Sequence, residues 1–219
     1  MTPPHVPIDV IETVLDEFGA QDDLGTLTVC ALVCGAWFPR SRFLIWRTVT
    51  ITSTDTLYSI CKTLQRDPDL RLVIHAVRLK HIHSKSFPHT APMVLLPYLP
   101  HLRRWDFRWP FSTMNLAKAT IACFCQYKAV KTLVLRDCLF PTPLHVYRLI
   151  HAFPVLEDVQ LYDVHFMGTS PDVSLLPIQH RACRTLSKLT VRSSSETRLP
   201  VSRYLHSLIS PKTPFSFSR

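Results

Sequence analysis

The stretch Val130-Lys-Thr-Leu-Val-Leu-Arg-Asp-Cys138 decides the fold of this chain. Apolar residues stand at its first, fourth and sixth positions, and the last two of these share one face of a strand because strand side chains alternate with period 2. The same spacing occurs six times in all: Trp46-x-x-Val49-x-Ile51, Ile74-x-x-Val77-x-Leu79, Leu102-x-x-Trp105-x-Phe107, Val130-x-x-Leu133-x-Leu135, Leu156-x-x-Val159-x-Leu161 and Leu186-x-x-Leu189-x-Val191.

These segments recur at a nearly constant interval, with starts separated by 28, 28, 28, 26 and 30 residues. Helix-like apolar spacing lies between them at 55–64, 114–127 and 144–153, whereas 84–100 is rich in proline and predicts a short irregular return. One such unit cannot bury its apolar face alone, so the units must stack. The pattern predicts an α/β fold with parallel strands inside and helices outside.

The repeated unit resembles a degenerate leucine-rich repeat. The resemblance implies an irregular solenoid of about six units over residues 46–210. Only the fourth unit has a residue of the Asn/Cys type, Cys138, at the turn position after its strand. Residues 211–219 are polar and contain helix and strand breakers, so we expect a disordered tail there.

The first fifty residues predict a helical module. Ile8, Ile11, Leu15 and Phe18 recur at spacings of 3, 4 and 3, which is one face of a helix that Pro7 can start. Asp22 or Asp23 can cap the next turn, and the segment 26–37 is apolar on nearly every side. Such a helix must be covered nearly all round, either by the rest of the chain or by a partner protein.

An ordered series of residues carries a resemblance to the F-box, in a layout close to that of F-box proteins from mushroom-forming fungi. The match spans about residues 5–50, with Val6 in place of the usual opening leucine and Gly35 expected inside the third helix. The series is Val6-Pro7-Ile8-Asp9-Val10-Ile11, Leu15, Asp23-Leu24, Leu27, Cys30, Val33-Cys34, Trp37 and Leu44-Ile45-Trp46-Arg47.

This resemblance implies a substrate-receptor subunit of an SCF-type cullin–RING ubiquitin ligase. The module would bind a Skp-type adaptor, and through it a cullin, while the repeats bind an unknown protein target. Catalysis would then belong to other subunits, so we expect neither enzymatic activity nor a cofactor in this chain. Trp37 and Trp46 would belong to the core of the module. The residues implied at or near the adaptor interface are Pro7, Ile8, Ile11, Leu15, Leu24, Leu27 and Val33.

The strand residues between the apolar ones predict an exposed concave face. Two rows run across it, of which one begins at Arg78 and the other at Lys80. The second row is a basic ladder that fits an acidic or phosphorylated target segment, although a solvated sheet face has the same composition. The candidate target-binding residues of this concave face, taken from both rows, are Arg78, Lys80, Asp106, Arg108, Arg136, Tyr162 and Arg192.

Composition limits the other function classes. The formal net charge of +9 keeps open a basic repeat protein that binds nucleic acid or acidic and phosphorylated partners, but the basic residues are too scattered to favour nucleic acid. A truncated, non-functional family copy is a third alternative. With four glycines, the chain contains no phosphate-binding glycine motif, and it contains no G-x-S-x-G nucleophile motif.

Targeting and metal signals are equally sparse. No secretory signal and no apolar run of 18 residues is present, so no membrane span is expected. Seven cysteines without framework or zinc spacing indicate reduced thiols, hence cytoplasm or nucleus. His81-x-His83 has no third and fourth ligand at a suitable spacing, so no metal site is expected.

Overall fold

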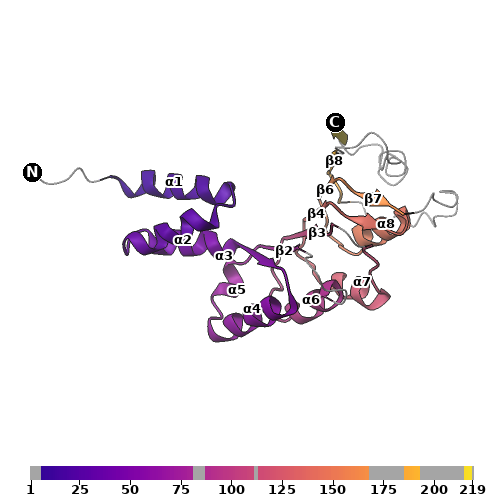
Figure 1. Ribbon diagram of the computed structural model, residues 1–219, viewed down its shortest axis with the longest axis horizontal. Helices are drawn as coiled ribbons and strands as arrows, with labels where there is room; N and C mark the ends of the chain where they lie inside the picture. Colours follow the sequence, from indigo (N-terminus) through magenta and orange to yellow (C-terminus); the bar gives the residue numbers. More distant parts are fainter. Residues whose placement is uncertain (1–5, 81–86, 111–112, 168–184, 193–214, 219) are drawn as a thin grey trace, which may run out of the picture. The chain divides into compact units, whose positions relative to one another are not determined.

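The computed structural model describes residues 6–80, 87–110, 113–167, 185–192 and 215–218. The chain divides into two compact units, Met1–Val49 and Thr50–Arg219 (Figure 1). The boundary falls within the stretch 46–50, which the sequence assigns to both the module and the first repeat. The first unit is helical, and the second is built on a parallel sheet flanked by helices.

Three helices form the first unit: α1 (Ile8–Ala20), α2 (Leu24–Val33) and α3 (Phe38–Arg47). Pro7 precedes α1 as predicted. Asp23 caps α2, because its carboxylate accepts a hydrogen bond of 3.0 Å from the backbone N–H of Thr26.

The core of this unit consists of Leu15, Leu27, Cys30 and Leu44, with partly buried apolar side chains packed around them. A Cβ atom added to Gly19 would lie 2.9 Å from Cδ2 of Leu44, so glycine permits the close approach of α1 to α3. The surrounding side chains are those of Ile11, Phe18, Trp37, Phe43 and Ile45.

The second helix is shorter than predicted. It ends at Val33, Cys34 is extended, and Gly35 lies in a turn rather than inside a helix. Pro39 sits in the first turn of α3, where its missing N–H costs nothing. Inside a continuing helix the same proline would remove a hydrogen bond and clash with the preceding turn.

The main sheet has seven strands in the order β1-β2-β3-β4-β6-β8-β9, and the boundary between the two units falls within β1. Residue pairing is parallel from β2 through to β9. The strands are β1 (Thr48–Ile51), β2 (Ala76–Lys80), β3 (Arg104–Arg108), β4 (Thr132–Arg136), β6 (Asp158–Tyr162), β8 (Lys188–Arg192) and β9 (Phe215–Ser218).

The register of the sheet confirms the predicted alignment of the segments. Val77 pairs with Trp105, Trp105 with Leu133, Leu133 with Val159 and Val159 with Leu189. All five side chains are buried. A slip of one residue would turn every apolar side chain to the opposite face, and this penalty specifies the register.

Helices accompany the sheet in chain order: α4 (Thr54–Arg66), the short α5 (Leu70–Val73), α6 (Phe87–Leu95), α7 (Lys118–Phe124) and α8 (Pro143–His151). Helices α4, α6, α7 and α8 follow one another along one side of the sheet, each against the next (Figure 1). As predicted, α4 buries the stripe Leu57, Ile60, Cys61 and Leu64.

Helix α6 corrects the expectation of an irregular return over 84–100. Pro88 stands in its first turn, a position compatible with proline, and Pro92 lies inside it. Ala91 and Leu95 are one helical turn apart and both are fully buried. Their burial offsets the hydrogen bond that Pro92 cannot make.

An aromatic cluster fills the middle of the second unit. The ring of Trp105 stacks on Phe107 with centroids 5.6 Å apart and meets Phe124 and Tyr127 edge-on at 5.5 and 5.4 Å. Phe124 in turn lies 5.2 Å from Phe153. These rings come from strands, helices and the segments between them, so the cluster joins neighbouring units through aromatic packing.

Two equivalent turns follow β4 and β6. Asp137 and Asp163 both have left-handed backbones, with φ of 52° and 51°, and each turn leads into a short strand of a second, two-stranded sheet, β5 (Leu139–Phe140) and β7 (His165–Phe166). Cys138 is buried in the first turn, where its thiol lies 3.6 Å from the carbonyl oxygen of Phe107 and donates to it. This side chain therefore links two successive repeats.

The end of the chain differs from the expected disordered tail over 211–219. Phe215–Ser218 form β9, which pairs in parallel with β8, while 211–214 and 219 lie outside the described residues. The open edge of β8 presents unpaired backbone groups, and the alternating Phe-Ser-Phe-Ser sequence has the period of a strand. No helix in the described part of the chain is long and apolar enough to cross a membrane.

Candidate docking surface and basic sheet face

The structure separates the seven predicted adaptor-contact residues into two groups. Pro7, Ile8, Leu24 and Val33 are exposed and Ile11 is half-buried. Leu15 and Leu27 belong instead to the core of the helical unit. Their apolar spacing marks the inward face of each helix, so both act by packing the module and lie away from its exposed surface.

Sequence reasoning missed the residues that now dominate this surface. Leu32 is 82% exposed, Val29 is also exposed, and on α1 so are Val10 and Val14. Leu32 is five residues from Leu27, which places it about 140° away around the helix, so the helical period alone could have found it. We call the exposed set the apolar docking surface: Ile8, Val10, Val14, Leu24, Val29, Leu32 and Val33.

Of the two predicted core tryptophans, Trp37 is half-buried and packs against the core cluster. Trp46 is half-buried as well. An ion pair also ties α1 to α3, since Arg40 Nε donates to Oδ1 of Asp16 at 2.7 Å. The guanidinium of Arg40 holds the pKa of the Asp16 carboxyl below its ordinary value.

In the second unit, the register brings the predicted face residues together in two rows. The first row is Arg78, Asp106, Val134, Gln160 and Thr190, and the second is Lys80, Arg108, Arg136, Tyr162 and Arg192. A third row, which we did not single out in the sequence, has the same strand parity: Ala76, Arg104, Thr132, Asp158 and Lys188.

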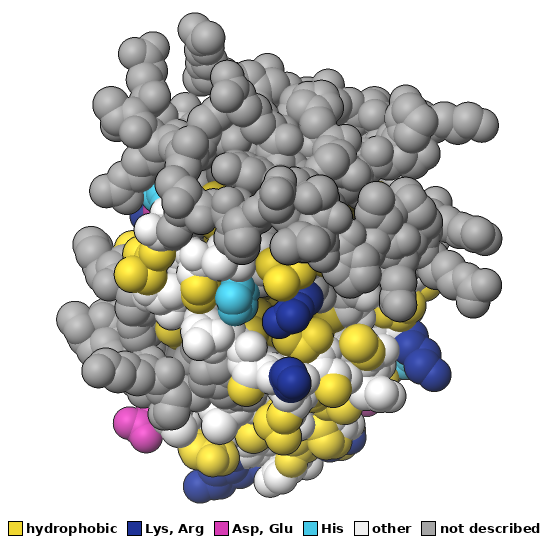
Figure 2. Space-filling view, turned by 90° about the vertical axis from the view of Figure 1, so that its right-hand side faces the viewer, with side chains coloured by type: hydrophobic (Ala, Val, Ile, Leu, Met, Phe, Trp, Pro, Cys, Tyr) yellow, Lys and Arg dark blue, Asp and Glu magenta, His cyan; other side chains and the backbone are white. Residues whose placement is uncertain are grey.

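These three rows form the basic sheet face. It holds seven basic side chains against the carboxylates of Asp106 and Asp158, a formal charge of +5. The side of the molecule where Figure 1 places α7 and α8 has a different distribution of charge. On that side, Lys and Arg side chains stand singly among apolar ones (Figure 2). Within the described residues, the strand register places the basic side chains of neighbouring strands next to one another on the basic sheet face.

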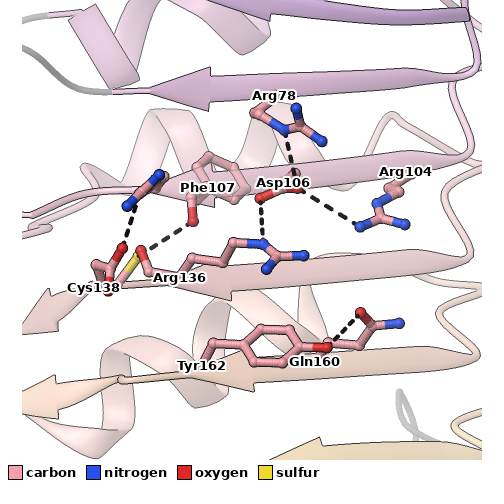
Figure 3. Close-up of polar contacts among 10 residues, drawn as sticks. Arg78, Arg104, Asp106, Phe107, Arg136, Cys138, Gln160 and Tyr162 are labelled. Atoms are coloured by element: carbon pink, nitrogen blue, oxygen red, sulfur yellow. Dashed lines mark hydrogen bonds and ion pairs between the residues drawn. The ribbon is translucent and has the colours of Figure 1, made fainter. Parts of the chain in front are cut away.

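Asp106 corrects the prediction of an exposed target-binding residue, because it is only 2% exposed. Its Oδ2 lies 3.3 Å from Nε of Arg78 and 3.7 Å from Nη2 of Arg104, and its Oδ1 lies 3.6 Å from Nε of Arg136 (Figure 3). Long arginine side chains from three adjacent strands cover the short carboxylate. We call these four residues the arginine cluster.

The rest of the second row is partly occupied by contacts within the chain. Arg108 Nε donates to Oδ2 of Asp137 at 2.9 Å. The ring of Tyr162 lies under two guanidinium groups, at 4.5 Å from Arg136 and 5.9 Å from Arg192. Cation–π contacts of this kind hold the arginines over the sheet.

Within the described ranges, groups that could serve redox or metal chemistry are not brought together. The described cysteines are free thiols, and burial raises the pKa of Cys138 to about 12. No cluster of three potential metal ligands occurs among the residues that the structure describes, and His81 and His83 lie outside them.

Comparison with known proteins found no match: no protein-family model, no curated protein and no solved structure resembles the chain.

Proposed function

We propose that this chain is the substrate-receptor subunit of an SCF-type cullin–RING ubiquitin ligase. The helical unit acts as an F-box that binds a Skp-type adaptor and, through it, a cullin. The second unit acts as an irregular leucine-rich-repeat solenoid that presents a protein target. Other subunits carry out the transfer of ubiquitin, and this chain contributes proximity. The free thiols fit a cytoplasmic or nuclear protein.

The observation that carries this proposal is the mismatch between the composition and the burial of α2. The helix is apolar nearly all round, yet it buries only Leu27 and Cys30. Leu24, Val29, Leu32 and Val33 remain exposed. Apolar side chains gathered on one short helix and left in water mark a protein–protein contact, because covering them is worth about 25 cal/mol per Å².

The sheet of the second unit supports its proposed role in presenting a protein target. Its strand–turn–helix repeat places one face of a parallel sheet away from the apolar core, and that face has charged residues on every strand from β2 to β8. A broad, rigid sheet face suits the binding of an extended polypeptide, since side chains from several strands can contact it together.

Adaptor docking is tested by co-expressing residues 1–219 with a fungal Skp-type adaptor, followed by size-exclusion chromatography in moderate salt. The decisive variant is Leu32→Glu, which places a charge on the apolar docking surface at a position where folding does not require burial. Its matched control is Leu72→Glu in α5 of the second unit, because Leu72 is also exposed, at 67%.

We expect a one-to-one complex for the unchanged chain and for Leu72→Glu, and a loss of the complex for Leu32→Glu. Circular dichroism should show both variants folded. A folded Leu32→Glu chain that elutes with the adaptor as the unchanged chain does would refute docking through this surface.

The basic sheet face favours one other candidate, a repeat protein that binds nucleic acid. Its charge of +5 would attract phosphate groups, and such binding weakens steeply as salt rises. Docking through apolar helices has a much weaker salt dependence. Adaptor co-elution between 50 and 300 mM salt, compared with binding of a single-stranded oligonucleotide, separates the two candidates.

A further inference from the structure

We propose that the ion pair between Asp16 and Arg40 positions α1 for docking, so that Val10 and Val14 meet the adaptor together with the apolar side chains of α2. This inference rests on the proposed function for the identity of the partner. Arg40 Nε donates to Oδ1 of Asp16 at 2.7 Å, and Arg40 Nη2 donates to Oδ2 at 2.5 Å. Two parallel N–H···O bonds of this kind fix the orientation of both groups as well as their separation.

Helix α1 needs such a link because its apolar contact with the rest of the helical unit is narrow. Of its 13 residues only Leu15 is buried, and Ile11 and Phe18 are partly buried beside it. These three residues lie along one line of the helix surface, because residues three and four apart are neighbours there. Apolar contacts are non-directional, so a helix held along a single line can roll about that line.

Asp16 and the α1 part of the apolar docking surface flank this line on opposite sides. Successive residues are about 100° apart around a helix, so Asp16 lies about 100° from Leu15 in one direction and Val14 about 100° in the other. Val10 is one turn before Val14 and shares its side. Both valines are exposed. A roll of α1 that separated Asp16 from α3 would therefore carry both valines away from their place beside the exposed residues of α2.

Arg40 is the fixed end of the pair. It stands in the first turn of α3, a helix whose Ser41 and Leu44 are buried. Its guanidinium lies over the ring of Phe43, 5.4 Å from the ring centroid, and Phe43 packs against the core of the unit. This cation–π contact holds the guanidinium in place on α3. The position of Arg40 is therefore determined by α3, and the ion pair transmits it to α1.

The exposure of the pair separates a positioning role from a role in stability. The side chains of Arg40 and Asp16 are 34% and 45% exposed, and ion pairs this accessible contribute little to folding because water screens them. Loss of the pair should therefore leave the unit folded but α1 loosely held. The ion pair of Lys131 with Glu157, at 2.8 Å in the second unit, is a matched control because its side chains are 55% and 46% exposed.

The test is a double-mutant cycle on the full chain, with the affinity for a Skp-type adaptor measured by isothermal titration calorimetry. Val14→Ala removes a docking side chain from α1, and Leu32→Ala removes one from α2. Each is made alone and together with Arg40→Gln. Arg40→Lys keeps the charge but loses the two-donor fork, and Lys131→Gln is the control. Amide hydrogen exchange of the same chains, without adaptor, reports how firmly α1 is held.

We expect Arg40→Gln to weaken adaptor binding about tenfold, Arg40→Lys about threefold and Lys131→Gln less than about twofold. In the Arg40→Gln chain, Val14→Ala should cause little further loss, because α1 no longer holds that side chain in place, whereas Leu32→Ala should keep its full effect. The amides of α1 should exchange faster in Arg40→Gln, and those of α2 should not.

Equal binding by Arg40→Gln and the unchanged chain, or independent losses for Arg40→Gln and Val14→Ala, would overturn the proposal. So would faster exchange throughout the helical unit, because that result indicates a general loss of stability. An unchanged chain that fails to bind the adaptor refutes the proposed function, and the docking role of the ion pair fails with it, even where hydrogen exchange shows that the pair holds α1.

Discussion

Nε of Arg136 on β4 lies 3.6 Å from Oδ1 of Asp106 on β3, beneath the open face of the sheet. This pair shows how a buried carboxylate and a partly exposed guanidinium are arranged on adjacent strands. The carboxylate is buried and cannot meet a ligand, yet it determines where three arginines gather. Removing it should therefore affect folding before it affects recognition.

We predict that Asp106→Ala destabilises the chain by about 2 kcal/mol, since three converging guanidinium groups lose their counter-charge and only part of each can be hydrated. Urea unfolding followed by circular dichroism measures the change. Glu157→Ala is the control, because the ion pair of Glu157 with Lys131 is exposed on both sides and should contribute less than 1 kcal/mol. Equal effects of the two variants would contradict a structural role for Asp106.

Burial in the helical unit leads to a second prediction. Leu27→Ala should destabilise that unit by about 3 kcal/mol, because Leu27 is fully buried and its truncation leaves a cavity. Leu32→Ala should change stability by less than about 0.5 kcal/mol, since Leu32 is on the surface. Thermal unfolding of both variants provides the measurement, and a larger effect at Leu32 would show that the second helix packs differently.

A buried hydroxyl provides the third prediction. Tyr127 Oη donates a hydrogen bond of 2.6 Å to the carbonyl of Pro92, and burial raises the pKa of Tyr127 above its ordinary value. Tyr127→Phe keeps the ring in the aromatic cluster but removes this hydrogen bond, at a cost of about 1 kcal/mol, while the carbonyl of Pro92 still accepts from the backbone N–H of Leu96 at 3.2 Å. Tyr58→Phe, at an exposed position, serves as the control in the same urea titration. Indistinguishable midpoints would exclude a contribution from this bond.

Cys138 predicts a dependence of stability on alkaline pH. Its pKa is about 12 in the folded chain and about 9 in an unperturbed thiol. Above pH 9 the unfolded chain loses this proton while the folded chain keeps it, so stability falls as pH rises from 9 to 12. At pH 10 the loss attributable to Cys138 is about 1 kcal/mol.

The measurement is urea unfolding of the unchanged chain and of Cys138→Ala at pH 7.5 and pH 10. The variant is less stable at pH 7.5, but it should lose less stability between the two pH values. Parallel losses in both chains would assign the pH dependence to other groups.

The strand register was predictable because the apolar pattern that specifies it lies within each short segment of sequence. Each segment has its apolar residues at fixed positions, and only one alignment buries all of them, as the pairing of Leu133 with Val159 illustrates. The helix of α4 was predictable for the same reason, from four apolar residues at helical spacing. The end of α2 at Val33 was not, because the apolar spacing continues to Trp37 while the helix stops before the extended Cys34.

The candidate site was predictable only in part. The rows of basic residues follow from the repeat, but the sequence does not show that Asp106 is covered while Arg136 is exposed. Likewise, Leu27 and Leu32 are both leucines in one apolar helix, and packing alone distinguishes the core residue from the surface residue. The missed contribution of Arg104 could have been found by extending the same alternation by one more position.

By itself, the sequence determined a helical N-terminal module, six strand segments in parallel register and a basic row along them, because apolar periodicity and strand alternation are properties of neighbouring residues. Only the tertiary structure decided which charges are buried together, which apolar side chains of α2 remain in water, and that Phe215–Ser218 form β9 beside β8. Those outcomes depend on side chains and backbone groups from segments far apart in the chain, whose mutual distances no local pattern specifies.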